Sequence, residues 1–251
     1  MSEHRVFGLI GYPLGHSFSR KYFTEKFAAE NINAEYRNFE IPSIDLLKGI
    51  LDSTPGLTGL NVTIPYKQQV MPMLDSLDPE AEAIGAVNVI KVTRGADGRI
   101  AGLKGYNSDV VGFRNSIAPL IKPGHKDALV LGTGGAAKAV WYGLKSLGLN
   151  PVYVSRSARE GVLTYADLDD EVMARCRVIV NATPLGMHPD VTACPPIPYD
   201  LITPDHVLYD VVYNPELTEF MRRGAERGAT VKNGIEMLLG QAVEAWRIWN
   251  G

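Results

Sequence analysis

The sequence predicts an α/β protein of two domains. Strand-like and helix-like segments alternate along its 251 residues, a length that suits one large α/β domain or two of ordinary size. At residues 130–139 a glycine-rich turn lies between an apolar strand and a helix, and it opens a second strand–helix series. We therefore expect a first α/β domain over residues 1–104, a second over 105–233, and a terminal helix over 234–251 that returns to the first domain.

Composition excludes several classes of protein. With 45% hydrophobic and 21% charged residues, the chain can bury a substantial core. A net charge of −3 offers no basic excess, which argues against nucleic acid or an anionic membrane as a partner. The start lacks signal-peptide features, and no segment reaches the roughly 18 apolar residues of a membrane span. Cys176 and Cys194 form no CxxC pair and the five histidines are scattered, so we expect reduced thiols, no metal site and a cytoplasmic protein.

The first hundred residues predict strands and helices in alternation, followed by a hairpin. Phe23 and Phe27 are spaced i, i+4 on a helix that Ser17 or Ser19 can cap. Pro65 stops a strand, and a new helical stripe starts at Tyr66. The turn-rich segment TRGADG separates two β-like runs, as in a hairpin. The predicted strands cover 5–11, 34–41, 57–64, 86–92 and 99–105, and the predicted helices cover 16–32, 43–51 and the segment from 66.

The second half predicts strands that alternate with loops or helices. Strand-like runs cover 127–131, 151–157, 176–184 and 206–213, and the segment 215–228 is helical in pattern. In the last segment, 234–250, one broad apolar face carries Ile235, Leu238, Leu239, Ala242 and Trp246. Strands separated by helices favour parallel βαβ units.

The stretch VLGTGGAAKA, residues 130–139, predicts a dinucleotide-binding turn. Gly132, Gly134 and Gly135 allow a tight turn and a close approach of pyrophosphate to the backbone, and Ala136 continues into the helix. The N–H groups at the start of that helix favour phosphate. Many helices begin near glycine, but the strand before this turn and the helix after it favour a Rossmann-like domain.

The end of the next strand predicts which nicotinamide cofactor is bound. NAD-binding folds place an acidic residue there to bind the ribose 2′-hydroxyl. Here Ser155 takes that place, with Arg156 next and Arg159 shortly after. Guanidinium groups bind a 2′-phosphate, which a carboxylate would repel. Surface arginines are often merely solvated, but together with the missing acid these two favour NADP.

Eight segments in order resemble the shikimate dehydrogenase family along almost the whole chain. They are GYPLGHSFS, GLNVTIPYK, IGAVNVI, GYNSDVVGF, GTGGAAKA, NATPLGM, DVVYNP and GIEMLLGQA. One such match would be weak, whereas eight in the family's order are specific. The resemblance implies a substrate-binding catalytic domain, an NADP-binding domain, and the reversible reduction of 3-dehydroshikimate to shikimate in aromatic amino-acid biosynthesis. We expect a monomer or a homodimer.

By this resemblance Lys67 and Asp109 flank the reacting hydroxyl. Hydride addition turns a carbonyl oxygen into an alkoxide that must receive a proton. Lys67 can stabilise that charge and supply the proton, while Asp109 keeps the ammonium and the substrate oriented. Taken alone, the two residues read more simply as a surface lysine and a helix-capping aspartate, so their assignment depends on the family match.

The resemblance also implies a polar substrate pocket. Ser17 and Ser19 would bind the carboxylate at the start of a helix, where N–H groups favour anions. Tyr213 would approach the substrate and nicotinamide from the second domain. The ring hydroxyls would be bound by Thr63, Asn88, Asn107 and Gln241, although a glutamine on a helix is more often only partly exposed.

Further cofactor contacts follow from the NATPLGM segment and from the glycine that opens the last segment. Asn181 and Thr183 come at a strand end, where ligands of open α/β sheets gather. Met187, with Gly186 beside it, would pack near the nicotinamide, although a core or loop role is nearly as common for a methionine. Gly234 completes the predicted cofactor set.

The chain departs from the family pattern at a few positions. The family usually continues its first motif with proline and then a His-Asn pair, where this chain has Arg20 and later Phe23 and Thr24. Ser108 and Val89 replace two common threonines. Arg20 would add charge beside the predicted carboxylate-binding serines and alter substrate affinity.

Two alternatives to this activity remain open. A quinate/shikimate dehydrogenase using NAD or NADP tends to carry an acid at the position of Ser155, which this chain lacks. A non-catalytic ligand sensor on the same fold could lose the lysine or the glycine loop, and this chain keeps both.

Overall fold

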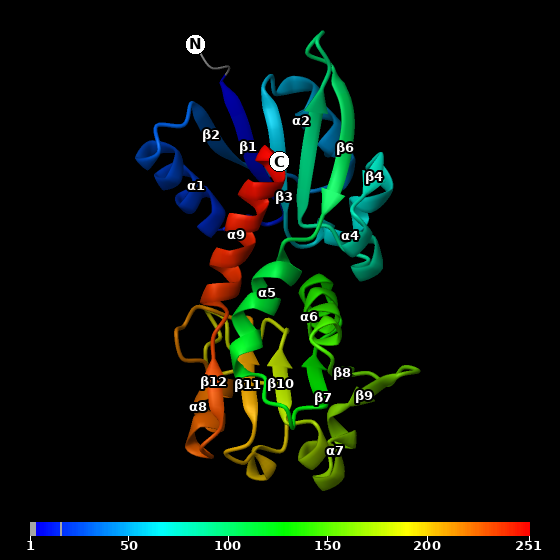
Figure 1. Cartoon of the computed structure of the whole chain (residues 1–251), viewed down its shortest axis with the longest axis vertical. Helices are drawn as coiled ribbons and strands as arrows, with labels where there is room; N and C mark the ends of the chain where they lie inside the picture. The colour runs from blue at the N-terminus through cyan, green and yellow to red at the C-terminus, as the bar shows by residue number, and fades with distance from the viewer. Residues whose placement is uncertain (1–3, 16) are drawn as a thin grey trace. The chain divides into compact units, whose positions relative to one another are not determined.

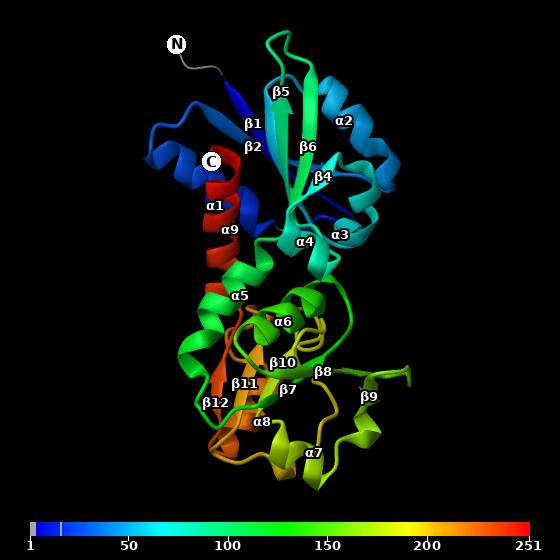
Figure 2. The same ribbon diagram turned by 45° about the vertical axis from the view of Figure 1, so that its right-hand side comes forward.

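The computed structural model describes residues 4–15 and 17–251 and shows two units, each built around its own sheet (Figures 1 and 2). The first unit holds the described residues up to Ser108 together with Ala242–Gly251, and the second holds Asp109–Gln241. The sequence placed these divisions after residues 104 and 233. His16, where the first predicted helix segment begins, lies outside the described residues.

The first unit has a mixed sheet in the order β2-β1-β3-β5-β6-β4. Strands β1 and β2 and strands β1 and β3 pair in parallel, whereas β3–β5 and β5–β6 are antiparallel. The strands are β1 (Arg5–Gly11), β2 (Ala34–Glu40), β3 (Leu57–Val62), β4 (Ser76–Leu77), β5 (Val89–Arg94) and β6 (Ile100–Tyr106). The helices are α1 (Phe18–Ala29), α2 (Leu47–Ser53), α3 (Tyr66–Gln69) and α4 (Pro79–Ile84), with 3₁₀ turns at Ile44–Leu46 and Met71–Met73.

The last helix, α9 (Ile235–Asn250), returns to the first unit with its final turns, as the sequence predicted. Ala242, Ala245 and Trp249 are buried in one core cluster with Phe7 and Phe23, beside α1 (Figure 1). The indole Nε1 of Trp249 also donates a hydrogen bond of 3.1 Å to the carbonyl of Ile90 in β5.

The second unit has a six-stranded sheet in the order β12-β11-β10-β7-β8-β9, and all its strand pairs are parallel. Its strands are β7 (Asp127–Leu131), β8 (Asn150–Ser155), β9 (Val162–Thr164), β10 (Val178–Asn181), β11 (Val207–Asp210) and β12 (Thr230–Lys232). Its helices are α5 (Asp109–Ile117), α6 (Gly135–Ser146), α7 (Asp170–Arg175), α8 (Glu219–Glu226) and the first turns of α9, with 3₁₀ turns at Ala118–Leu120, Tyr165–Asp167 and Tyr199–Leu201. Strands β7, β10 and β11 are almost continuously apolar, as expected of strands covered on both faces. The predicted fold class, with an α/β first domain and a Rossmann-like second domain, is confirmed.

Two local expectations differ from the structure. Tyr66 and Val70 are buried as the predicted stripe requires, but α3 ends at Gln69 and a 3₁₀ turn with Pro72 follows. Proline lacks the N–H that a longer helix would use there. The first sheet is also less parallel than the alternating pattern suggested, because the hairpin β5–β6 is part of it. Within residues 4–15 and 17–251, no helix has both the length and the apolar character that a membrane crossing needs.

The docking of α9 on the first sheet can be tested at Gly59. A Cβ at Gly59 in β3 would overlap the indole of Trp249, so Gly59→Ala must displace the helix or the strand. We expect this substitution to lower the free energy of unfolding by about 1–3 kcal/mol in denaturant titrations. Gly49→Ala is the matched control, because a Cβ at Gly49 in α2 meets no atom within 4 Å and alanine favours a helix. Equal stability of the two variants would contradict this packing.

Candidate active site

Three of the predicted site residues of the first unit, Lys67, Asn88 and Asn107, are joined by hydrogen bonds at one short segment. This 86–88 segment consists of Ala86, Val87 and Asn88. The backbone N–H of Val87 donates to the carbonyl of Lys67 at 2.7 Å. The side chain of Asn107 donates from Nδ2 to the carbonyl of Ala86 at 2.9 Å. The 86–88 segment therefore holds two neighbours in place: the backbone at Lys67, and Asn107, the residue that follows β6.

Asn88 links the same segment to Ser108, directly before α5. Its Oδ1 accepts the backbone N–H of Ser108 at 2.6 Å, and its Nδ2 donates to the Ser108 hydroxyl at 3.0 Å. Its carbonyl accepts the N–H of Val62 at 2.9 Å at the end of β3. The side chains of Asn88, Asn107 and Ser108 are all buried. Ser108 thus performs a positioning task that the sequence noted only as a departure from the family pattern.

Lys67 and Asp109 occupy defined places in their own units. Lys67 is half-buried on the short helix α3, whose first residue, Tyr66, donates its buried hydroxyl to the carbonyl of Ile41 at 2.5 Å. Thr63 is half-buried, and its N–H donates to the carbonyl of Ile10 at 2.9 Å, which continues the strand pairing beyond β3. Asp109 is the first residue of α5 and only 7% of its surface is exposed. The pairing of Lys67 with Asp109 stays a prediction.

The predicted carboxylate-binding serines begin α1. Ser17 is the N-cap residue, and its Oγ accepts the N–H of Arg20 at 3.2 Å. Ser19 hydrogen-bonds the hydroxyl of Tyr36 in β2, which in turn donates to Oδ1 of Asn61 at 2.7 Å. Tyr36 and Asn61 are buried polar residues that the sequence analysis missed.

Arg20 lies on the outer side of the same helix. With Thr24, Glu35 and Tyr36 it lines an open hollow of about 410 Å³ between α1 and β2. Its side chain is exposed, and an effect of its charge on substrate affinity stays a prediction.

The glycine turn of the second unit fits a pyrophosphate. Gly132 has φ of +105° and a Cβ there would lie 3.1 Å from the carbonyl oxygen of Ala182, so only glycine suits this position. Gly134 is the N-cap of the 12-residue helix α6, with no side-chain cap hydrogen bond, and a Cβ there would meet no atom within 4 Å. Gly135 and Ala136 form the first turn. Open space in front of uncapped N–H groups is the arrangement that a phosphate requires.

One of the residues predicted to select NADP, Arg159, contacts this turn. Arg159 is exposed and donates from Nη2 to the hydroxyl of Thr133 at 3.3 Å, between Gly132 and Gly134. Arg156 is also exposed, directly after β8. The hydroxyl of Ser155 closes the turn between them, since it accepts the N–H of Ser157 at 3.1 Å. The structure thus brings a guanidinium to the glycine turn, and a hydroxyl stands where NAD-binding folds have a carboxylate.

A buried carboxylate ties together the two loops that carry the remaining predicted cofactor residues. Asp210, at the end of β11, accepts hydrogen bonds from Asn181 Nδ2 at 3.0 Å, from the N–H of Val212 at 3.0 Å and from the Thr218 hydroxyl at 2.6 Å. Asn181 ends the neighbouring strand β10, directly opposite Asp210 in register, and its Oδ1 accepts the Thr183 hydroxyl at 2.6 Å. Burial raises the pKa of Asp210 to about 6, although its three donors act in the opposite direction. The sequence analysis missed Asp210, because an aspartate in an apolar strand gave no signal of its own.

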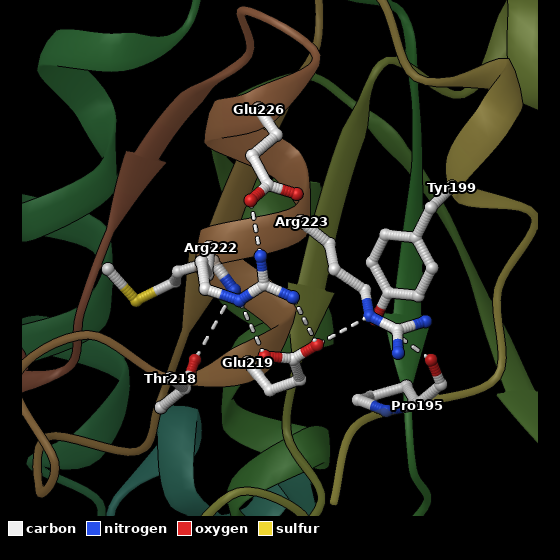
Figure 3. Close-up of polar contacts among 8 residues, drawn as sticks. Pro195, Tyr199, Thr218, Glu219, Arg222, Arg223 and Glu226 are labelled. Carbon is white, nitrogen blue, oxygen red and sulfur yellow. Dashed lines mark hydrogen bonds and ion pairs between the residues drawn. The ribbon is translucent and has the colours of Figure 1, made fainter. Parts of the chain in front are cut away.

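Thr218 extends this network to the surface of α8, which it caps by accepting the N–H of Met221 at 3.4 Å. Figure 3 shows the first residue of the helix, Glu219, between Arg222 and Arg223, each of which approaches it to 2.7 Å. The hydrogen bonds from these guanidinium groups lower the pKa of Glu219 to about 2. Arg223 also lies 5.1 Å from the ring centre of Tyr199. This ionic cluster anchors the start of α8 and connects to the predicted cofactor residues through Thr218.

Four further predicted residues lie in loops and in the last helix of the second unit. Met187 and Tyr213 follow β10 and β11 and are 49% and 38% exposed. Gly234 lies directly against the carbonyl of Val211, where a Cβ would overlap, so the glycine also has a packing reason. Gln241 is buried, and its Nε2 donates to the carbonyl of Leu238 at 2.9 Å within α9. Their contacts with substrate or cofactor stay predictions.

Comparison with known proteins gives one consistent family. Residues 9–90 match the family model described as the shikimate dehydrogenase substrate binding domain. A relative named shikimate dehydrogenase (NADP(+)) from Desulforamulus reducens is 36% identical over 268 residues, which cover 98% of this chain and 90% of the relative.

Solved structures agree. Shikimate 5-dehydrogenase from Thermus thermophilus, in complex with NADP(H) and shikimate, is similar with a TM-score of 0.83 and 30% identity over 98% of this chain and 94% of that one. Quinate dehydrogenase from Corynebacterium glutamicum, in complex with NAD, is similar with a TM-score of 0.84 and 29% identity over the same shares of 98% and 94%. With a matching fold and full-length relatives, this chain belongs to the shikimate dehydrogenase family.

Proposed function

We propose that this protein is an NADP-dependent shikimate dehydrogenase that reduces 3-dehydroshikimate to shikimate and catalyses the reverse reaction. The observation that carries the proposal is that the 86–88 segment, which contains Asn88, hydrogen-bonds the backbone of Lys67 and the side chain of Asn107. The same chain also has an uncapped glycine turn for a dinucleotide. Full-length relatives bear this name, and a similar structure holds both NADP(H) and shikimate. The direct test is turnover of shikimate with NADP by the purified protein.

We assign two tasks to the side chains of this protein: protonating the carbonyl oxygen of the substrate and orienting the reacting groups. When bound at the glycine turn, the reduced cofactor would supply the hydride for the carbonyl carbon. Lys67 then delivers a proton to the carbonyl oxygen as negative charge develops there, and in the reverse direction it accepts the proton of the hydroxyl. Asp109 keeps the ammonium and the reacting hydroxyl in place.

The remaining substrate contacts are proposed from the same resemblance. Thr63, Asn88, Asn107 and Gln241 bind ring hydroxyls, and Tyr213 approaches from the second unit. Ser17 and Ser19 bind the carboxylate, supported by their place at the start of α1, where backbone N–H groups favour an anion.

The cofactor is held by the second unit. Gly132, Gly134, Gly135 and Ala136 accommodate the pyrophosphate, and Arg156 and Arg159 bind the 2′-phosphate. Thr183, Met187 and Gly234 lie toward the nicotinamide, and Asn181 holds Thr183 in place. The similarity to an NAD-bound quinate dehydrogenase keeps a quinate/shikimate enzyme as the second candidate. The absence of an acid at Ser155 favours NADP, and an assay of both acids with both nicotinamides distinguishes the two.

Replacement of Lys67 tests the proton transfer. Lys67→Ala should lower kcat by about 10²–10⁴-fold, the usual contribution of general acid–base catalysis, while shikimate still binds in calorimetry. Lys48→Ala, an exposed lysine on α2, is the control and should leave kcat unchanged. Normal turnover by the Lys67 variant would remove this residue from the mechanism.

Replacement of Arg156 tests the 2′-phosphate assignment. Arg156→Ala should raise the KM for NADP about 10-fold or more, because a charge-assisted hydrogen bond is lost, and should leave the KM for NAD nearly unchanged. Arg227→Ala, an exposed arginine after α8, should change neither value. If the two cofactors were affected equally by the Arg156 substitution, the selectivity assignment would be wrong.

The raised pKa of Asp210 predicts that the free energy of unfolding depends on pH. Its folded-state pKa of about 6 lies above its ordinary value of 3.8, so between these values the native state binds more protons than the unfolded chain. The contribution of Asp210 is therefore fully present below pH 3.8 and is lost as the pH rises through about 6, by an amount on the order of 3 kcal/mol.

Asp210→Asn removes this titration with little change in shape. The unfolding free energy of the wild type minus that of the variant should fall between about pH 4 and pH 7, as measured by denaturant titration at each pH. Asp97→Asn, an exposed turn residue in the first unit, should show no comparable fall. A constant difference for the Asp210 pair would place its pKa near the ordinary value.

A further inference from the structure

Tyr36 is a buried polar residue that the proposed reaction leaves without a role. It lies in β2 with 5% of its surface exposed, and its ring stacks on Phe23 of α1 at 5.0 Å between ring centres and 12° between planes. Burial raises the pKa of its hydroxyl, so this group stays protonated and remains a hydrogen-bond donor throughout the physiological range.

The Tyr36 hydroxyl reaches across a strand to Asn61. In register, Tyr36 lies opposite Phe7 and Asn61 opposite Leu9, so β1 separates the two residues and all four share one face of the sheet. Two strand spacings amount to about 9.6 Å, a span that only a long side chain can bridge. Tyr36 makes the connection with a hydrogen bond of 2.7 Å to Oδ1 of Asn61.

A second contact fixes which way the Asn61 amide points. Its Nδ2 donates to the carbonyl of Asn88 at 3.4 Å, so the amide nitrogen faces the 86–88 segment and the oxygen faces Tyr36. An amide carries two N–H groups, and among residues 4–15 and 17–251 this bond accounts for one of them, so the second can serve a ligand. Asn61 also precedes Thr63 by two residues, which places both on the same face at the end of β3.

We propose that Tyr36 is a positioning residue for substrate, which holds the amide of Asn61 with one N–H directed at a ring hydroxyl of shikimate. Through its contact with Ser19, the same hydroxyl joins the proposed carboxylate contact to the hydroxyl contacts. Without it, the Asn61 oxygen loses its donor and the amide can rotate, which presents an acceptor where the substrate needs a donor. This inference rests on the proposed function and adds a selectivity determinant to it.

The test compares two single-oxygen deletions. Tyr36→Phe removes the hydroxyl that binds Asn61 and keeps the ring stack on Phe23. Tyr199→Phe is the matched control, because the half-buried Tyr199 lies in the second unit and its hydroxyl also donates a hydrogen bond, to the carbonyl of Pro195 at 2.9 Å. Both variants should lose melting temperature to a similar extent. Only Tyr36→Phe should raise the KM for shikimate, by roughly 3- to 10-fold, with the KM for NADP within about 2-fold of wild type.

A double substitution distinguishes positioning from general loosening. Asn61→Ala should raise the KM for shikimate at least as much as Tyr36→Phe, and the double variant should match Asn61→Ala alone, because Tyr36 acts through Asn61. Additive effects, equal effects of Tyr36→Phe and Tyr199→Phe on the KM for shikimate, or a parallel rise in the KM for NADP would each overturn the inference.

Calorimetric binding of shikimate to the wild-type protein separates this inference from the proposed function. Binding without turnover would contradict the proposed reaction, and the Tyr36 comparison would then be decided on the dissociation constant. Absence of binding would overturn both.

Discussion

The hydrogen bonds of the 86–88 segment are the constraint on which the catalytic half of the molecule depends. A lysine on a short helix after a strand can serve many purposes, and its role in catalysis depends on what fixes its backbone. Here the N–H of Val87 donates to the carbonyl of Lys67. The carbonyl of Ala86 accepts a hydrogen bond from the side chain of Asn107, and the side chain of Asn88 accepts one from the backbone N–H of Ser108. The left-handed conformation of Gly85, with φ of +68°, lets the chain leave α4 and enter this segment. Without these bonds the polar side chains joined to the 86–88 segment would have to be ordered when the proposed substrate binds, at a cost in affinity.

In the second unit, a buried carboxylate, Asp210, holds the loops after two strands in place. Two adjacent parallel strands end at Asn181 and Asp210, and the loops beyond them carry residues that we propose to contact the cofactor. A fully buried carboxylate is costly, which its raised pKa reflects. Three donors offset that cost and connect both loops to the start of α8. In both units, therefore, strand ends supply the location and a few buried polar side chains supply the geometry.

Much of this architecture follows from local pattern. The apolar runs of β1, β7 and β10 and the glycine turn before α6 are each a strong signal within a few residues. A serine cap of α1 was also predicted, and the structure selects Ser17 over Ser19. The short strands β4, β9 and β12, two or three residues each, carry no periodicity and were not predicted. Tyr36, Asn61 and Asp210 escaped notice for another reason. Their roles come from partners 25, 27 or 29 residues away, or from a neighbouring strand, and pairing across a sheet is visible only once the strand order is known.

The return of α9 makes the first unit discontinuous in the chain. Its aromatic cluster combines Phe7 and Phe23 with Trp249, more than 200 residues later in the chain, so this core cannot close until the segment that forms α9 has been synthesised. The second unit, in contrast, is one uninterrupted segment and can assemble earlier. Loss of the final turns of α9, by truncation or proteolysis, would leave the apolar residues of this sheet face exposed. Exposed apolar surface of this kind promotes aggregation and is bound by chaperones.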